Sequence, residues 1–208
     1  MTNRTSISMN GLGTFFKVKG ILLLSIIFIL IADTYCHAQR VKISTSLGDI
    51  TLQLEPDRAP ITTTNYLRYV KEGFYRGGSF YRTVTPGNQE KSHIKIEVIQ
   101  AGAHPWMQNF LYEPIPLERT RDTRLNHING AISMARGGPD TACESFFICI
   151  GDQPELDYGG KRNPDGQGFA VFGHVISGMD VVQAIHSSNA EGQALMPPII
   201  MHDVVILH

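Results

Sequence analysis

Residues 130–175 read "GAISMARGGPDTACESFFICIGDQPELDYGGKRNPDGQGFAVFGHV" and contain three short segments that favour β-strands. These segments are "GAISMA", "FFICIG" and "FAVFGHV", which are rich in apolar, aromatic and β-branched residues. Residues 157–168, between the second and third segments, are dense in glycine and also carry proline and asparagine, a composition typical of turns. Short strands joined by turn-rich connections predict a mainly β fold.

Strand signals continue on both sides of this stretch. Residues 40–46 and 49–54 alternate in polarity across Leu47-Gly48, which predicts a hairpin. The further predicted strands are "SFYRTV" (79–84), "IEVIQA" (96–101) and "IIMHDVVILH" (199–208). We expect residues 102–129 to form a long loop with extended pieces, because they show little periodicity.

Two segments have helical features. Pro60 suits the first turn of a helix that carries an apolar stripe over Tyr66, Leu67 and Val70 and ends at Gly73. Apolar residues at 179, 182 and 185 predict a second, short helix. About eight strands and only two helices predict a single closed antiparallel β-barrel.

The first 38 residues have the pattern of a secretory signal peptide. Three cations precede the apolar run 21–32, and Ala38 supplies a small residue before a plausible cleavage site. The run is shorter than the roughly 20 residues that span a bilayer, so no permanent anchor is expected. We expect an exported, periplasmic or extracytoplasmic domain over residues 39–208. Acylation at Cys36 is an alternative, which the bulky Tyr35 disfavours.

The charge balance of residues 39–208 indicates which classes of partner are not expected. Three of the 18 Lys+Arg and one of the 19 Asp+Glu precede Gln39, leaving 15 cations and 18 acids without a block of like charge. Nucleic acid and anionic membrane surfaces are therefore not expected as partners. Cys143 and Cys149 are expected to be free thiols, although export would permit a disulfide.

The common motifs for hydrolase, zinc and nucleotide chemistry are absent. The chain has no GxSxG, HExxH, CxxC or GxxxxGK[ST] sequence. Its histidines are scattered without ligand spacing, so we expect surface or core histidines and no metal or cofactor. Asp152, Glu155 and Asp157 are interpreted as a solvated acidic loop in preference to a paired-carboxylate acid/base site.

Arg82 at the centre of "SFYRTV" is the most unusual strand residue. Strict alternation places it on the same face as Phe80 and Val84. An arginine between two apolar side chains has two interpretations. Either it is a surface residue of the barrel wall that extends its charge to solvent, or it is held in place as a functional residue of a site.

Three blocks, in order, resemble the cyclophilin family. They are "APITTTNYLRYVKEGFYRGGSFYR" (59–82), "NGAISMARGGPDTACESFFICIGDQPELD" (129–157) and "GFAVFGHVISGMDVV" (168–182), and the resemblance extends over roughly residues 41–207. It implies an eight-stranded barrel capped by two helices and peptidyl-prolyl cis/trans isomerase activity on proline-containing polypeptides. We expect a monomer that assists the folding of exported proteins. The alternative is a proline-peptide-binding module or holdase chaperone with little turnover.

The resemblance also assigns roles to residues. Arg82 matches the family's catalytic arginine, Gln100 the glutamine that orients the substrate carbonyl, and Phe147 the floor of the proline pocket. The substrate-binding positions that the resemblance implies are Val98, Ala135, Arg136, Leu156 and Phe169, with Ala135 and Arg136 on the strand that binds the peptide backbone.

The chain departs from the family pattern at several groove positions. Glu97, Ser145, Glu155 and Phe169 replace a phenylalanine, a glutamine, a tryptophan and a histidine found in well-known members, and residues 85–95 form a longer turn than in many relatives. These departures motivate the binding-module alternative.

Overall fold

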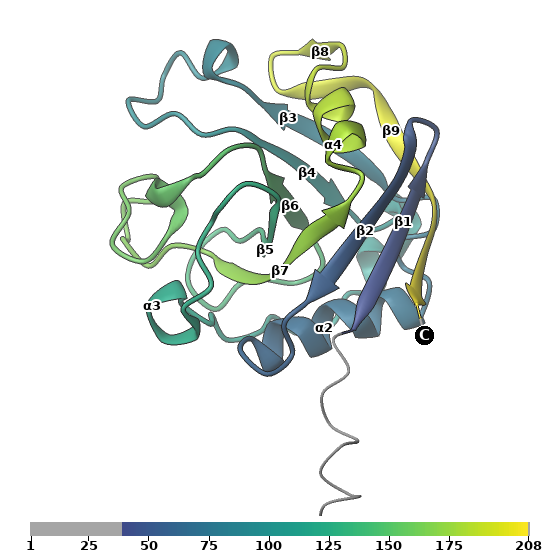
Figure 1. Ribbon diagram of the computed structural model, residues 1–208, viewed down its shortest axis with the longest axis horizontal. Helices are drawn as coiled ribbons and strands as arrows, with labels where there is room; N and C mark the ends of the chain where they lie inside the picture. The colour runs from purple at the N-terminus through teal and green to yellow at the C-terminus, as the bar shows by residue number, and fades with distance from the viewer. Residues whose placement is uncertain (1–38, 208) are drawn as a thin grey trace, which may run out of the picture. The chain divides into compact units, whose positions relative to one another are not determined.

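Eight antiparallel strands close on one another in the computed structural model, which describes residues 39–207 (Figure 1). Around the barrel the order is β1-β2-β7-β5-β6-β4-β3-β9, and β9 pairs with β1 to complete the ring. The strands are β1 (Arg40–Thr45), β2 (Gly48–Leu54), β3 (Ser79–Val84), β4 (Val98–Gly102), β5 (Ala131–Met134), β6 (Phe146–Cys149), β7 (Ala170–Ser177) and β9 (Ala194–Leu207). The predicted closed eight-stranded barrel is confirmed.

A ninth strand lies outside the ring. β8 (Ala190–Glu191) pairs only with the start of β9, and the sequence did not predict it. The pairing extends β9 to 14 residues, beginning five residues before the strand that was expected at 199.

The two predicted helices are confirmed and lie at opposite ends of the barrel (Figure 1). α2 (Pro60–Lys71) begins with the predicted proline and buries Tyr66, Leu67 and Val70. α4 (Met179–His186) buries Val182 and Ile185. The expected loop 102–129 also contains the 3-10 helix η2 (Pro105–Phe110) and the four-residue helix α3 (Thr120–Thr123). Two other 3-10 turns, η1 (Pro86–Asn88) and η3 (Pro154–Leu156), lie in connections beside the candidate site.

An aromatic cluster fills the barrel interior. The Tyr66 ring from α2 lies 5.3 Å from Tyr75, 5.5 Å from Phe146 and 5.1 Å from Phe172, measured between ring centroids. Phe80 contacts the same Phe146 ring edge-on at 6.1 Å. Burying this much aromatic surface in close contact contributes strongly to folding.

A β-bulge in β3 corrects part of the predicted face assignment: it separates Phe80 from Arg82, while Val84 stays on the face of Arg82. Phe80 pairs with Ala101 and Arg82 pairs with Gln100, so two steps along β3 match one step along β4. Because a bulge inserts one residue, it reverses the alternation that follows. Phe80 therefore packs in the barrel interior, fully buried, while Arg82 is directed to the opposite side of the wall.

The predicted signal peptide, its cleavage site after Ala38 and Cys36 lie outside the described residues. Across residues 39–207, no helix has the length and apolar character needed to traverse a bilayer. Cys143 and Cys149 are both free thiols, as expected, and Cys149 is fully buried.

Candidate active site

The predicted catalytic residues lie in one row across the barrel wall. Arg82 on β3 pairs with Gln100 on β4, Gln100 pairs with Phe147 on β6, and Phe147 pairs with Ser133 on β5. Residues directly opposite in neighbouring antiparallel strands place their side chains on the same face. The sheet register therefore holds the predicted catalytic groups side by side on the outer face of the wall.

The guanidinium of Arg82 is fixed by hydrogen bonds to two glutamines. Its Nη1 donates to Gln100 Oε1 at 2.8 Å, while Nε and Nη2 both donate to Gln193 Oε1, at 2.9 and 2.6 Å. Gln100 Nε2 in turn donates to the Tyr81 hydroxyl at 2.7 Å. An arginine has five N–H donors in a planar fork, so one hydrogen on each Nη is left for a ligand.

Burial lowers the pKa of Arg82, and the neighbouring Tyr81 opposes that shift. The arginine pKa starts so high that the side chain stays cationic at neutral pH. A fixed cation in a half-buried position interacts more strongly with a developing partial charge than it would in open water.

All eight predicted site residues line one cavity of about 230 Å³. Besides Arg82, Gln100 and Phe147, its walls include Val98, Ala135, Arg136, Leu156 and Phe169. Three further lining residues, Ile96, Arg162 and Asn163, were not predicted. We call this space the proline cavity, because its size and lining suit a small ring.

Aromatic rings form the floor of the proline cavity. Phe169 meets Phe147 edge-on, with ring centroids 5.2 Å apart and planes at 86°. The Phe147 ring is also stacked on His127, with ring centroids 5.9 Å apart and planes at 10°. Phe147 and Leu156 are both nearly inaccessible to solvent, so the floor is apolar and immobilised by its neighbours.

His127 lies behind this floor in a buried polar chain that the sequence did not reveal. Its Nδ1 is 2.7 Å from Asp157 Oδ1 and its Nε2 is 3.0 Å from Ser133 Oγ. Burial is the main cause that lowers the pKa of His127, and Asp157 partly opposes it. The order Asp-His-Ser resembles a hydrolase triad, but Ser133 is fully buried and cannot meet a substrate.

The acidic residues 152, 155 and 157 also have structural partners that the sequence did not reveal. Asp157 accepts hydrogen bonds from the His127 backbone and ring, Asp152 accepts from Asn129 N, and Glu155 accepts from Lys161 N. The three carboxylates thus support separate backbone segments and form no carboxylate pair with one another, and Asp152 is exposed, as a solvated loop requires.

Arg136 has a different environment from the one expected. β5 ends at Met134, so Ala135 and Arg136 lie just beyond the strand that was predicted to carry them. The Arg136 guanidinium forms a bidentate pair with Asp165 at 2.8 and 3.0 Å, donates to Gly168 O, and lies 5.0 Å from the Phe169 ring centroid. Its donors hold the 157–168 loop against the cavity wall, and the pairing lowers the pKa of Asp165.

Three of the four departures from the family pattern do not line the proline cavity. Glu97 faces His186 at 3.9 Å, the Ser145 hydroxyl donates to Glu144, and the Glu155 carboxylate accepts from the backbone of Lys161. Only Phe169 is part of the lining, where it extends the aromatic floor.

Gln193 is the main functional residue that sequence reasoning missed. It lies in the turn between β8 and β9, 111 residues after Arg82, and its Nε2 donates to Asn88 O at 3.0 Å. A glutamine after a glycine in an unpredicted turn carries no local signal of such a role.

Comparison with known proteins agrees with this geometry. Residues 40–206 match the family model described as "Cyclophilin type peptidyl-prolyl cis-trans isomerase/CLD". The chain belongs to the cyclophilin family. It is therefore a peptidyl-prolyl cis-trans isomerase, as the resemblance implied.

Two bacterial peptidyl-prolyl cis-trans isomerases are similar to the chain over most of their length. The chain is 32% identical over 161 residues to peptidyl-prolyl cis-trans isomerase A of Dickeya dadantii (strain 3937), covering 77% of this chain and 76% of that protein. It is 33% identical over 169 residues to peptidyl-prolyl cis-trans isomerase B of Escherichia coli (strain K12), covering 80% and 95%.

A solved cyclophilin confirms the fold. A cyclophilin type peptidyl-prolyl cis-trans isomerase of Cryptosporidium parvum superposes with a TM-score of 0.66 at 22% identity, covering 83% of this chain and 99% of the other. Across residues 39–207, no group of three or more His, Cys, Asp or Glu residues is arranged to hold a metal ion.

Proposed function

We propose that this protein accelerates X-Pro isomerisation by donating a hydrogen bond from Arg82 to the prolyl nitrogen as the peptide bond twists. Resonance sets a barrier of about 18–20 kcal/mol for this rotation. In the twisted state the nitrogen keeps its lone pair and becomes a hydrogen-bond acceptor. A donor placed there stabilises the twisted form more than the planar form, which is the requirement for catalysis.

The fixed geometry of Arg82 is the observation that carries this proposal. Gln100 and Gln193 engage three of its N–H groups and leave one hydrogen on each Nη, beside a floor made by Phe147. Little reorganisation is then needed when the substrate arrives, because the donor is already oriented.

The apolar walls supply the second requirement, which is a dry site for the ring. Val98, Phe147, Leu156 and Phe169 would enclose the pyrrolidine, and Gln100 would hold the neighbouring carbonyl with the second hydrogen of its Nε2. Excluding water lowers the local dielectric constant and strengthens the hydrogen bond from Arg82.

One hydrogen bond cannot account for the whole acceleration. A hydrogen bond to a charged group contributes about 1.5–3 kcal/mol net, whereas even modest enzymes lower their barriers by about 8 kcal/mol. The remainder must come from orientation of the ring and its flanking carbonyls within the proline cavity. No bond is broken, so no nucleophile or proton shuttle takes part.

The proposed clients are exported polypeptides. This assignment depends on the basic, apolar and small-residue pattern of residues 1–38, and a monomeric mature domain beginning at Gln39 is expected. Mass spectrometry of the purified exported protein should find that N-terminus. A lipidated Cys36 or an intact Met1 would contradict the assignment.

An isomerase assay with Arg82→Ala tests the mechanism. We expect kcat/KM on an X-Pro peptide to fall at least about tenfold, the loss of one charge-assisted hydrogen bond, while peptide binding survives. Arg82→Lys should also lose activity, because an ammonium does not reproduce the planar fork. Arg76→Ala is the matched control, since that arginine is exposed and pairs with Asp203 away from the cavity.

The outcomes separate the possible functions. Equal kcat/KM for Arg82→Ala and the parent would remove Arg82 from the mechanism. Tight binding of the peptide by the parent without turnover would favour the holdase alternative and contradict the proposal.

A further inference from the structure

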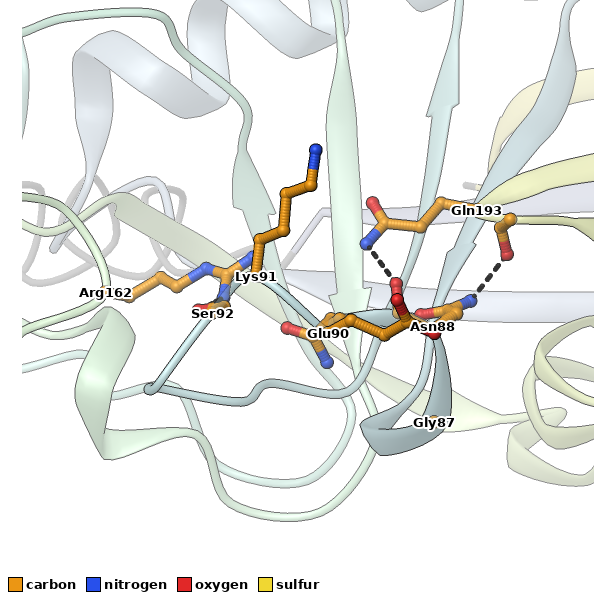
Figure 2. Close-up of a pocket in the computed structure, with 9 residues that line it drawn as sticks. Gly87, Asn88, Glu90, Lys91, Ser92, Arg162 and Gln193 are labelled. Atoms are coloured by element: carbon orange, nitrogen blue, oxygen red, sulfur yellow. Dashed lines mark hydrogen bonds between the residues drawn. The ribbon is translucent and has the colours of Figure 1, made fainter.

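A second cavity adjoins the proline cavity and has no role in the mechanism above. It has a volume of about 680 Å³ and lies between residues 87–92, Arg162 and the Gly192-Gln193 turn (Figure 2). We call it the loop pocket. Its lining is Gly87, Asn88, Gln89, Glu90, Lys91, Ser92, Arg162, Gly192 and Gln193.

Two residues connect the loop pocket to the proline cavity. Arg162 lines both spaces. Gln193 lines the loop pocket, and its side-chain oxygen accepts the two hydrogen bonds from Arg82. A polypeptide that places its proline beside Arg82 can therefore continue past Arg162 into the loop pocket.

The walls of the loop pocket are tied together by hydrogen bonds. Gln89, which is only 4% exposed, donates to Thr85 O and Ile96 O and closes the base of the 85–95 loop. Asn88 donates to Gly192 O, and Gln193 donates back to Asn88 O, as the dashed lines in Figure 2 show.

Arg162 fixes the far side of the same loop. Its Nη1 donates to Ser92 Oγ and to Ile94 O, both at 2.6 Å. Nε and Nη2 of this side chain make no hydrogen bond to any residue in the range 39–207 that the structure describes. The pocket is thus a recess with hydrogen-bonded walls and unused guanidinium donors.

Two guanidinium groups at this junction lack a carboxylate partner. Within residues 39–207, no Asp or Glu oxygen lies within 4.0 Å of the charged nitrogens of Arg82 or Arg162, in contrast to Arg136, which pairs with Asp165. Burial is the main cause that lowers the pKa of Arg162, and electrostatic repulsion from Arg82 is the second cause. Besides Arg162, the loop pocket is lined by one acid and one base, Glu90 and Lys91, so the uncompensated charge at the junction is positive and attracts an anion.

We propose that the loop pocket is a subsite for the polypeptide segment beside the proline, and that Arg162 selects a carboxylate-bearing residue, Asp or Glu, in that segment. This inference rests on the proposed function of the proline cavity. An incoming carboxylate would accept from the free Nε and Nη2 of Arg162 in the geometry that suits a guanidinium fork. It would also offset the repulsion between Arg162 and Arg82.

The acidic residue should lie close to the proline in sequence. The two cavities share Arg162 as a wall, and an extended chain advances about 3.3–3.6 Å per residue. A position within about three residues of the proline therefore reaches the loop pocket.

A charge scan of peptides tests the subsite. N-acetylated, C-amidated peptides with one proline would carry Glu, Gln or Lys at each position from three before to three after it, and NMR exchange spectroscopy would give kcat/KM. At one position we expect Glu to exceed Gln about threefold to tenfold, with Lys below Gln, and the ratio to shrink as salt rises. Arg162→Gln should bring the Glu-to-Gln ratio towards one.

Control variants keep the result interpretable. Arg162→Lys retains the charge and should retain part of the ratio, and Arg76→Gln should leave it unchanged. The parent scan and its salt dependence do not depend on how well any variant folds. If the parent turns over all peptides with a ratio near one everywhere, or if folded Arg162→Gln keeps the full ratio, the subsite is wrong although the proposed function stands. If no peptide is turned over, both are wrong.

Discussion

Phe146 and Phe147 are neighbours on β6, and their rings lie on opposite sides of the barrel wall. Phe146 is enclosed by Tyr66, Tyr75 and Phe80 in the interior. Phe147 faces the proline cavity, where its partners are Phe169, His127 and the row that contains Gln100. Both rings are almost fully buried, at 0% and 5% exposure.

The difference between the two sides lies in what holds the side chains. The interior depends on apolar and aromatic contact between strands and α2. The cavity side adds a polar framework, in which Gln193, Gln100 and Arg136 fix groups that would otherwise have many rotamers. We infer that the interior determines how stable the barrel is, whereas the framework determines whether the cavity is catalytic.

Alanine substitution of each phenylalanine should separate these contributions most clearly. Phe146→Ala should cost about 3–5 kcal/mol of unfolding free energy, because it leaves a hole in an enclosed cluster. Its kcat/KM per folded molecule should change little. Phe147→Ala should destabilise the barrel less, because one side of the ring faces a cavity, and should lower kcat/KM at least about tenfold.

Urea unfolding and an isomerase assay on the same samples make the comparison. Ile148→Val, in the same strand with a small loss of volume, is the control for general disturbance of β6. If Phe146→Ala and Phe147→Ala lose stability and activity in the same proportion, the two faces do not differ as we infer.

The buried histidine behind the cavity should give the protein a pH-dependent stability. Burial depresses the pKa of His127 below its ordinary 6.5. Below about pH 6.5 this histidine binds a proton in the unfolded chain but stays neutral in the folded protein. The free energy of unfolding therefore falls as the pH falls, by at most about 1.4 kcal/mol per pH unit. The contribution is fully present above pH 6.5. Unfolding free energies measured between pH 7.5 and 5 should show this slope.

The His127→Gln variant identifies the source of that slope. It should be less stable than the parent at pH 7, because its contacts with Asp157 and Ser133 are altered, but flatter between pH 6.5 and 5. The control is His202→Gln, an exposed histidine on β9. Equal slopes in the parent and His127→Gln would assign the dependence to other groups.

Strand positions could be predicted from the sequence because their signal is local. Alternating polarity, turn residues and the first-turn proline of α2 identified eight strands and two helices within a few residues. The bulge at Tyr81 could not be predicted, because it depends on the pairing register between β3 and β4 and not on the sequence of β3 alone.

The residues of the candidate site also fall into those that the sequence predicted and those that it did not. Six of the eight predicted lining residues lie in the three blocks that resemble the family, and Val98 and Gln100 lie between the first and second blocks, within the range of the resemblance; most of the eight are on strands or directly beside them. Gln193, Arg162 and the pairing of His127 with Asp157 were missed. Each acts across long separations in the chain, through loops whose paths only the folded barrel defines.

Gln193 tests the contribution of the polar framework by itself. Gln193→Ala removes the acceptor for Arg82 Nε and Nη2 and leaves the guanidinium attached to Gln100 alone. Because the cation itself remains, we expect a smaller loss than in Arg82→Ala, about threefold to tenfold in kcat/KM. The loss should appear in kcat and not in KM, since the apolar floor still binds the ring.

Two further variants distinguish positioning from general loop damage. Gln193→Glu keeps an acceptor for Arg82 and should recover most of kcat, although it loses the donation to Asn88 O. Gln183→Ala, an exposed glutamine on α4, should behave like the parent. If Gln193→Ala and Gln193→Glu lose kcat equally, the glutamine acts by supporting the 85–95 loop and not by orienting Arg82. In that case the catalytic geometry would depend on the strand row of Arg82, Gln100 and Phe147, and the framework would serve only the loop pocket.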